Sequence, residues 1–118
     1  MVSDEVGRGP VPTTIEVLSE AEAGGTSATV VIRGEIDVAT SPRLRSTITA
    51  LLAEGVAGLT IDFSGVSFID SSGLGVLVGA LKRVRETPGG SLQVVGATDF
   101  VRKIFEITGL HTLFLVDD

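Results

Sequence analysis

The chain has 118 residues, a formal net charge of −6 and no cysteine. A chain of this length forms one domain and buries roughly two thirds of the surface that its unfolded form exposes. Without cysteine it has no disulfide framework and no thiolate chemistry. Its net negative charge disfavours nucleic acid and anionic membranes as partners. No apolar run approaches the roughly 18 residues of a membrane span, and no secretory signal pattern opens the chain, so we expect a cytoplasmic protein.

Two strands are expected after a short tail. Residues 1–12 contain closely spaced Gly and Pro and few apolar side chains, which predicts a flexible N-terminal tail before a domain at 13–118. Residues 13–18 and 28–33 alternate between apolar and polar side chains, as half-buried strands do. The glycine-containing run at 22–26 predicts a hairpin turn, so these two strands should pair antiparallel.

A first helix and a third strand are expected next. Ser41 followed by Pro42 predicts a helix start, with a capping hydroxyl and then a proline at the first helical position. Gly55 is expected to end this helix in a left-handed conformation. Alternating apolar residues at 59–63 then predict the third strand.

The rest of the chain continues this alternation. Apolar residues at spacings of three and four predict one helix that begins at Ser71 or Ser72, and a later helix that Thr98 caps and Gly109 closes. The remaining strands are expected at 92–95 and 113–116. The resulting order, β-β-α-β-α-β-α-β, predicts an α/β fold. It is a single mixed sheet of right-handed parallel crossovers and one antiparallel strand, with amphipathic helices packed on it.

The segment 68–75 places a carboxylate and two hydroxyls at a helix N-terminus. The first amide groups of a helix lack intrahelical acceptors, and the helix dipole is positive there, so an added phosphate is tolerated. In the simpler interpretation Asp70, Ser71 or Ser72 caps the helix, which contributes about 1 kcal/mol. In the other, Ser71 accepts a phosphate, which adds about −1.5 to −2 charges and prevents docking of a partner without unfolding the domain.

Gly73, Gly75 and Gly79 all fall within this predicted helix. Each costs up to about 1 kcal/mol relative to alanine, so each needs a structural reason. One reason is close packing against the sheet. Another is a low helix face on which a second protein can lie, and the two reasons are compatible.

Three polar residues follow the second strand. Glu35, Asp37 and Thr40 are expected at the same edge of the sheet as Ser71, because ligand and partner sites gather at the carboxyl ends of parallel strands. The alternative is that they are solvated loop residues that help to cap the first helix.

Other chemistry has little local support. His111 is the sole histidine and is expected at the entry to the last strand, without a nucleophile elbow around any serine, so a hydrolase that uses Ser71 is disfavoured. One histidine and no cysteine do not supply the usual metal ligand set. The two glycine-rich phosphate-binding patterns, GxxxxGK(S/T) and GxGxxG, are absent, and no cofactor is expected.

Three blocks of the sequence, at 34–37, 62–75 and 107–110, resemble the STAS domain and, more narrowly, the anti-sigma factor antagonists of bacteria. The resemblance implies a regulator without catalytic activity, whose unphosphorylated form binds an anti-sigma factor that is also a serine kinase. That binding releases a sigma factor for transcription. The kinase would phosphorylate Ser71, which would end the binding, and a PP2C-type phosphatase would reverse it.

The resemblance also implies which residues surround the acceptor. The expected contact or shaping residues are Asp37, Thr40, Asp70, Ser72, Gly73, Leu74 and Gly75. A monomer or weak dimer is expected. Family members usually continue into a final helix, whereas this chain reaches Asp118 at its last expected strand. The alternative function is a STAS interaction module of a scaffold or transport complex that is not phosphorylated, although such modules often lack the acceptor hydroxyl.

Overall fold

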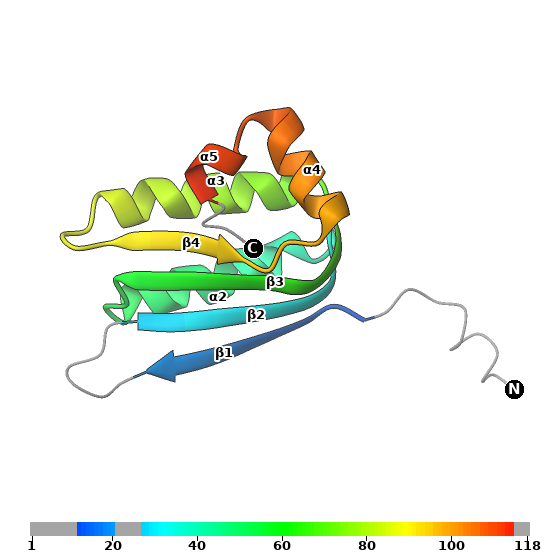
Figure 1. Ribbon diagram of the computed structural model, residues 1–118. Helices are drawn as coiled ribbons and strands as arrows, with labels where there is room; N and C mark the ends of the chain where they lie inside the picture. Colours follow the sequence, from blue (N-terminus) through cyan, green and yellow to red (C-terminus); the bar gives the residue numbers. More distant parts are fainter. Residues whose placement is uncertain (1–11, 21–26, 115–118) are drawn as a thin grey trace, which may run out of the picture.

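The computed structural model describes residues 12–20 and 27–114 (Figure 1). The expected turn at 22–26, and all of the expected tail except Pro12, lie outside the described residues. The elements are, in chain order, β1 (Thr14–Glu20), β2 (Ser27–Ile36), α2 (Ser41–Ala53), β3 (Gly58–Ile69), α3 (Ser71–Arg85), β4 (Ser91–Val95), α4 (Asp99–Thr108) and α5 (His111–Phe114).

The described strands form one sheet in the order β1-β2-β3-β4. β1 pairs antiparallel with β2, whereas β2 with β3 and β3 with β4 pair parallel, as the sequence predicts. Helices α2 and α3 lie side by side on one face of the sheet, and α4 crosses near the end of β4 (Figure 1). The α/β mixed-sheet class is therefore confirmed. No helix in the described ranges is long and apolar enough to cross a membrane.

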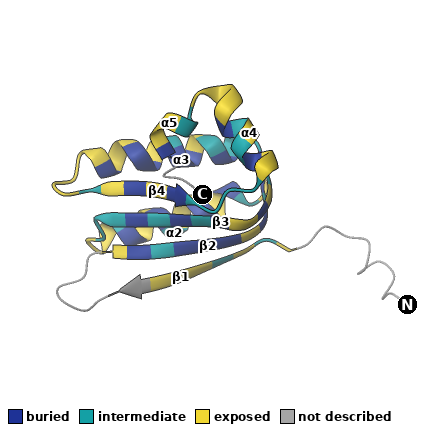
Figure 2. Ribbon diagram, viewed as in Figure 1, coloured by how far each residue is buried: buried dark blue, intermediate teal, exposed yellow. Residues whose placement is uncertain are grey.

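The core lies between the sheet and its helices. Alternate residues of β2 and β3 point into it, so buried positions mostly alternate with less buried ones along these strands (Figure 2). The alternation breaks at Val31 in β2 and at Ser64 and Gly65 in β3. Phe105 of α4 packs edge-on against both Phe63 and Phe114, with ring centroids 6.1 and 5.9 Å away. These contacts attach α4 and α5 to the body of the domain.

The predicted final strand is wrong in its described part. Residues His111–Phe114 form α5, in which the amides of Leu113 and Phe114 both donate to the carbonyl of Leu110. The last two residues of the expected strand, at 115–116, lie outside the described part. A short apolar run has the same composition in a strand and in a buried helical turn. Here burial of Phe114 against Phe105 is achieved by the helical turn.

The helix ends follow the expected chemistry with one exception. Thr98 caps α4, and Gly55 and Gly109 adopt left-handed conformations after α2 and α4. Ser41, however, does not cap α2: it is the first helical residue and is buried, and Thr40 occupies the cap position without a side-chain capping bond. The Thr40 hydroxyl instead bonds within the preceding loop, a competing use of short polar side chains.

The register between β2 and β3 shifts twice, between Val31 and Arg33 and between Gly34 and Glu35. Such irregularities bend and twist the paired strands. Figure 1 shows both strands curving at the end where α3 begins. The curvature ends with Ile36 paired to Ile69, so the two segments that follow these strands start side by side.

Candidate functional site

The start of α3 is capped by Asp70. Its backbone is extended (φ −114°, ψ −172°), and its carboxylate accepts hydrogen bonds from the amides of Ser72 and Gly73, with Oδ1 at 2.9 and 3.3 Å. The Ser72 hydroxyl donates to the same oxygen. The carboxylate, and neither serine, is therefore the cap, which satisfies two of the otherwise unpaired amides of the first turn.

Asp70 is held in its ionised form. The hydrogen bond from the Ser72 hydroxyl lowers the pKa of Asp70 below its ordinary value of 3.8, and the amides of Gly73 and Ser72 act in the same direction against a partial desolvation. Hydrogen bonds to a carboxylate favour its charged form. A negative charge therefore stands beside Ser71 at neutral pH.

Ser71 is exposed at the first position of α3. Its hydroxyl makes no hydrogen bond to any described residue, because Asp70 and Ser72 complete the cap without it. The side chain is thus accessible to another protein at the positive end of a helix dipole. An anion attached there gains from that dipole.

The loop between β2 and α2 lies directly beside this turn. The amide of Asp70 donates to the carbonyl of Ile36 over 3.1 Å, which joins the two segments. Within the loop the Thr40 hydroxyl donates to the carbonyl of Glu35 (2.9 Å) and accepts from the amide of Asp37 (2.9 Å). Asp37 and Thr40 therefore lie at the same edge as Ser71, where the sequence places them, and they hold the loop in shape.

The residues after Ser72 separate into packed and open positions. Gly73 is buried, and a Cβ there would lie 2.6 Å from Cγ2 of Ile36 and 2.8 Å from Cγ1 of Ile69, so this glycine permits close packing of α3 on the sheet. Leu74 is partly buried against the core. Gly75 is exposed, and a Cβ there would meet nothing within 4 Å.

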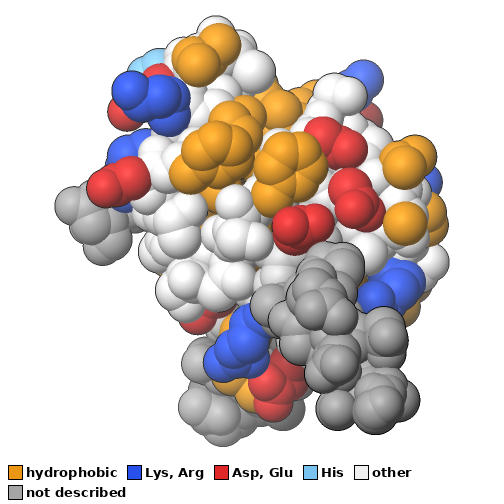
Figure 3. All heavy atoms as spheres, turned by 90° about the vertical axis from the view of Figure 1, so that its right-hand side faces the viewer, with side chains coloured by type: hydrophobic (Ala, Val, Ile, Leu, Met, Phe, Trp, Pro, Cys, Tyr) orange, Lys and Arg blue, Asp and Glu red, His pale blue; other side chains and the backbone are white. Residues whose placement is uncertain are grey.

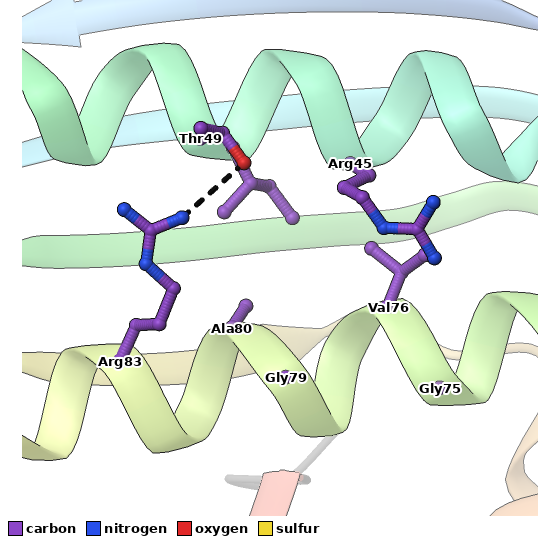
Figure 4. A pocket seen from close by; sticks show the side chains of 8 residues that line it. Arg45, Thr49, Gly75, Val76, Gly79, Ala80 and Arg83 are labelled. Atoms are coloured by element: carbon purple, nitrogen blue, oxygen red, sulfur yellow. Dashed lines mark hydrogen bonds between the residues drawn. The ribbon is translucent and has the colours of Figure 1, made fainter.

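A groove of about 150 Å³ runs between α2 and α3 (Figure 4). Gly75 and Gly79 lie on its α3 side, and a Cβ at either would meet nothing within 4 Å. Arg45 of α2 and Arg83 of α3 border it, and the Arg83 guanidinium donates to the Thr49 hydroxyl over 3.3 Å. The groove begins one helical turn after Ser71, so the two exposed glycines keep this part of the α3 surface low.

The arrangement around His111 differs from a serine hydrolase. This residue begins α5, which lies against α4 and β4, and its Nδ1 is buried without a hydrogen-bond partner in the described part of the chain. A serine triad needs a group that orients the histidine ring through this atom. No three metal-ligating side chains gather within 12–20 and 27–114.

An aromatic pair at this edge was missed by the sequence analysis. Phe68, three residues before Ser71, stacks on Phe100 of α4 with ring centroids 6.3 Å apart and an interplanar angle of 25°. Phe100 remains 55% exposed. Because side chains alternate along β3, Phe68 points to the other face of the sheet from its buried neighbour Ile69. The contact of Phe68 with α4 depends on tertiary packing, which the alternation does not reveal.

The chain is similar to proteins of one family. The sequence model of the STAS domain matches residues 19–118. The anti-sigma-B factor antagonist of Staphylococcus aureus (strain NCTC 8325 / PS 47) is 36% identical over 89 residues, which cover 75% of this chain and 82% of the relative. Its namesake in Staphylococcus epidermidis is 34% identical over the same shares of both chains.

Solved structures share the fold. The anti-sigma factor antagonist from Mycobacterium paratuberculosis has a TM-score of 0.77 and 29% identity, over 90% of this chain and 86% of its own. The Bacillus cell fate determinant SpoIIAA in its phosphorylated form has a TM-score of 0.62 and 25% identity, over 88% and 89% of the two chains. SpoIIAA in its unphosphorylated form has a TM-score of 0.71 and 24% identity, over 88% and 86%.

Proposed function

Because this chain belongs to the STAS domain family, we propose that it acts as an anti-sigma factor antagonist controlled by phosphorylation of Ser71. In the unphosphorylated form it would bind an anti-sigma factor in the cytoplasm and so release a sigma factor. The observation that carries the proposal is the exposed Ser71 beside the Asp70 cap. The names of the curated relatives support the same activity.

The geometry favours a phosphate that leaves the fold intact. Esterification of Ser71 breaks no hydrogen bond within the described residues, because the cap is made by Asp70 with Ser72 and Gly73. The added charge lies at the positive end of α3. SpoIIAA is solved both with and without its phosphate, and both forms are similar in fold to this chain.

The same phosphate would prevent binding. A serine kinase that modifies Ser71 brings the phosphates of ATP to this hydroxyl. After transfer, the phosphoserine and the ionised Asp70 both face the remaining phosphates of the nucleotide, and like charges at such short range repel. A PP2C-type phosphatase would restore the binding form. The contact surface would include the predicted residues Asp37, Thr40, Asp70, Ser72, Gly73, Leu74 and Gly75.

The proposal is tested with a panel of anti-sigma factor kinases from the same genome. Each purified kinase is incubated with ATP and the protein, and the intact mass is measured. We expect one added phosphate on the wild type and none on Ser71→Ala. Phosphate on the Ser71→Ala variant, or no phosphate with any of the kinases, would contradict the proposal.

The second candidate is an interaction module that is never phosphorylated. It is favoured by the Phe68–Phe100 pair, in which Phe100 is more than half exposed and offers a binding surface in either state of Ser71. The two candidates differ in the response to Ser71→Asp. A phosphorylation switch predicts weaker binding to the partner with an unchanged circular dichroism spectrum, whereas an unregulated module predicts unchanged binding.

A further inference from the structure

The five phenylalanines of the chain divide into two groups. Phe63, Phe105 and Phe114 are fully buried and pack edge to face in the core. Phe68 and Phe100 instead stack on one another at the edge of the sheet that carries Ser71, with Phe100 more than half exposed. Burial of an aromatic ring is strongly favourable, so a ring that stays exposed calls for an explanation. An exposed aromatic contact beside Ser71 is a candidate for contact with another protein.

The position of this pair is tied to Ser71 by the backbone. Phe68 and Ser71 are three positions apart in the chain, so their Cα atoms lie within about 11 Å of each other. The cap of α4 fixes the other ring, because the Thr98 hydroxyl bonds both the amide of Val101 and the carbonyl of Val66 on β3. Both rings are therefore presented by regular elements with fixed relative positions, and neither depends on a free loop.

The surroundings of the pair are acidic on one side. Glu35 is the strand partner of Phe68 across β2 and β3, and Asp99 immediately precedes Phe100. Figure 3 shows apolar side chains at the centre of this face with a group of acidic side chains directly beside them. On the same strand, the guanidinium of Arg33 lies 3.7 Å from the carboxylate of Glu16, with which it forms an ion pair.

We propose that the Phe68–Phe100 pair, with Glu35 beside it, is the anchoring surface for the anti-sigma factor, which would place an apolar side chain on the rings and a lysine or arginine against Glu35. The inference rests on the proposed function and adds a second contact to it. A stable protein interface buries about 800 Å² on each partner, more than one helix end provides. Aromatic side chains near the centre of an interface contribute most of its binding energy.

Charge selects this occupant over a second copy of the chain. Two copies that met through this surface would bring their own carboxylates together, in a protein whose net charge is already −6. Repulsion between like charges would oppose such a dimer. A partner with basic side chains around an apolar one complements the surface in both respects.

The test measures the affinity of the unphosphorylated protein for whichever anti-sigma factor kinase of its genome phosphorylates Ser71. We expect Phe100→Ala to raise the dissociation constant roughly tenfold or more. The shape-conserving Glu35→Gln change should raise it about threefold and flatten its dependence on salt. Leu18→Ala is the matched control, because Leu18 is 49% exposed but pairs with Thr29 near the far end of β2.

The outcomes separate the two levels of the proposal. If the wild type binds and is phosphorylated but Phe100→Ala binds equally well, the anchoring surface is wrong and the proposed function stands. If no kinase binds or modifies the wild type, both fail. A dimer in sedimentation that Phe100→Ala abolishes would assign the surface to a second copy and overturn our choice of partner. Circular dichroism of Phe100→Ala, and of the second variant Phe100→Gln, checks that a loss of binding does not come from a loss of structure.

Discussion

Two helices begin at the same edge of the sheet, and each begins with a serine. Ser41 opens α2 and is only 4% exposed, whereas Ser71 opens α3 and is exposed. Both follow a parallel strand, and both lie at the positive end of a helix dipole. The position at a helix start therefore does not decide by itself which serine another protein can reach.

The difference arises from how each turn uses its polar side chains. Before α2, the Thr40 hydroxyl bonds Glu35 and Asp37, so the loop closes on itself and Ser41 packs inward. Before α3, the carboxylate of Asp70 reaches forward past Ser71 to the amides of the next two residues. The forward cap leaves Ser71 exposed, with a hydroxyl that makes no hydrogen bond to any described residue.

The largest difference in stability is expected when each of these two serines is replaced by aspartate. Ser41→Asp places a carboxylate in a buried position and should lower the free energy of unfolding by at least about 2 kcal/mol, even with a favourable helix dipole. Ser71→Asp is exposed and should leave stability nearly unchanged. Chemical denaturation of both variants checks this. If the two variants were equally stable, the result would contradict the structural difference between the two turns.

The glycines of α3 provide the next test. Gly73→Ala should lower the free energy of unfolding by about 1–2 kcal/mol, because overpacking against Ile36 and Ile69 outweighs the gain in helix propensity. Gly79→Ala meets open space and should raise it by up to about 1 kcal/mol. Thermal melts compare the two. A stabilising Gly73→Ala would show that α3 is less closely packed on the sheet than described.

The smallest effect concerns the charge of the cap. Since the pKa of Asp70 is lower in the folded protein than its ordinary value of 3.8, its ionised form stabilises the fold above that value. This contribution is lost as the pH falls through the folded pKa. Asp70→Asn should therefore have a lower melting temperature than the wild type near neutral pH, and the gap should narrow below pH 3.8. A gap that is independent of pH would contradict the role of the charge.

Much of this could be predicted from local sequence. Alternation located the strands, and the order of elements gave the class of fold, because both depend on short-range periodicity. The Asp70–Ser71–Ser72 run predicted a helix start that carries a cap and a candidate site, and the structure confirms the helix start. Which of the three residues caps α3 became clear only from the geometry. Thr98 and Gly109 behave as expected because their roles are set by neighbours in sequence.

The failures share a physical cause, which is competition from contacts that the local pattern does not contain. The sequence predicted Ser41 as the cap of α2, but the cap position is occupied by Thr40. The Thr40 hydroxyl forms hydrogen bonds with the backbone of Glu35 and Asp37 and does not cap the helix. The run ending at Phe114 looked like a strand, but packing on Phe105 is achieved by a helical turn. The stacked rings of the anchoring surface come from segments 32 residues apart, beyond the reach of periodicity.

The central claim is that a phosphate on the hydroxyl that Asp70 leaves free blocks binding without disturbing the fold. The most direct measurement is a titration of the anti-sigma factor kinase with fully phosphorylated protein, with its circular dichroism recorded in parallel. We predict that the phosphate maps to Ser71 and never to Ser41, that the spectrum is unchanged, and that binding is lost. Phosphorylated protein that binds as tightly as the unmodified form, or that has lost its folded spectrum, would contradict the account.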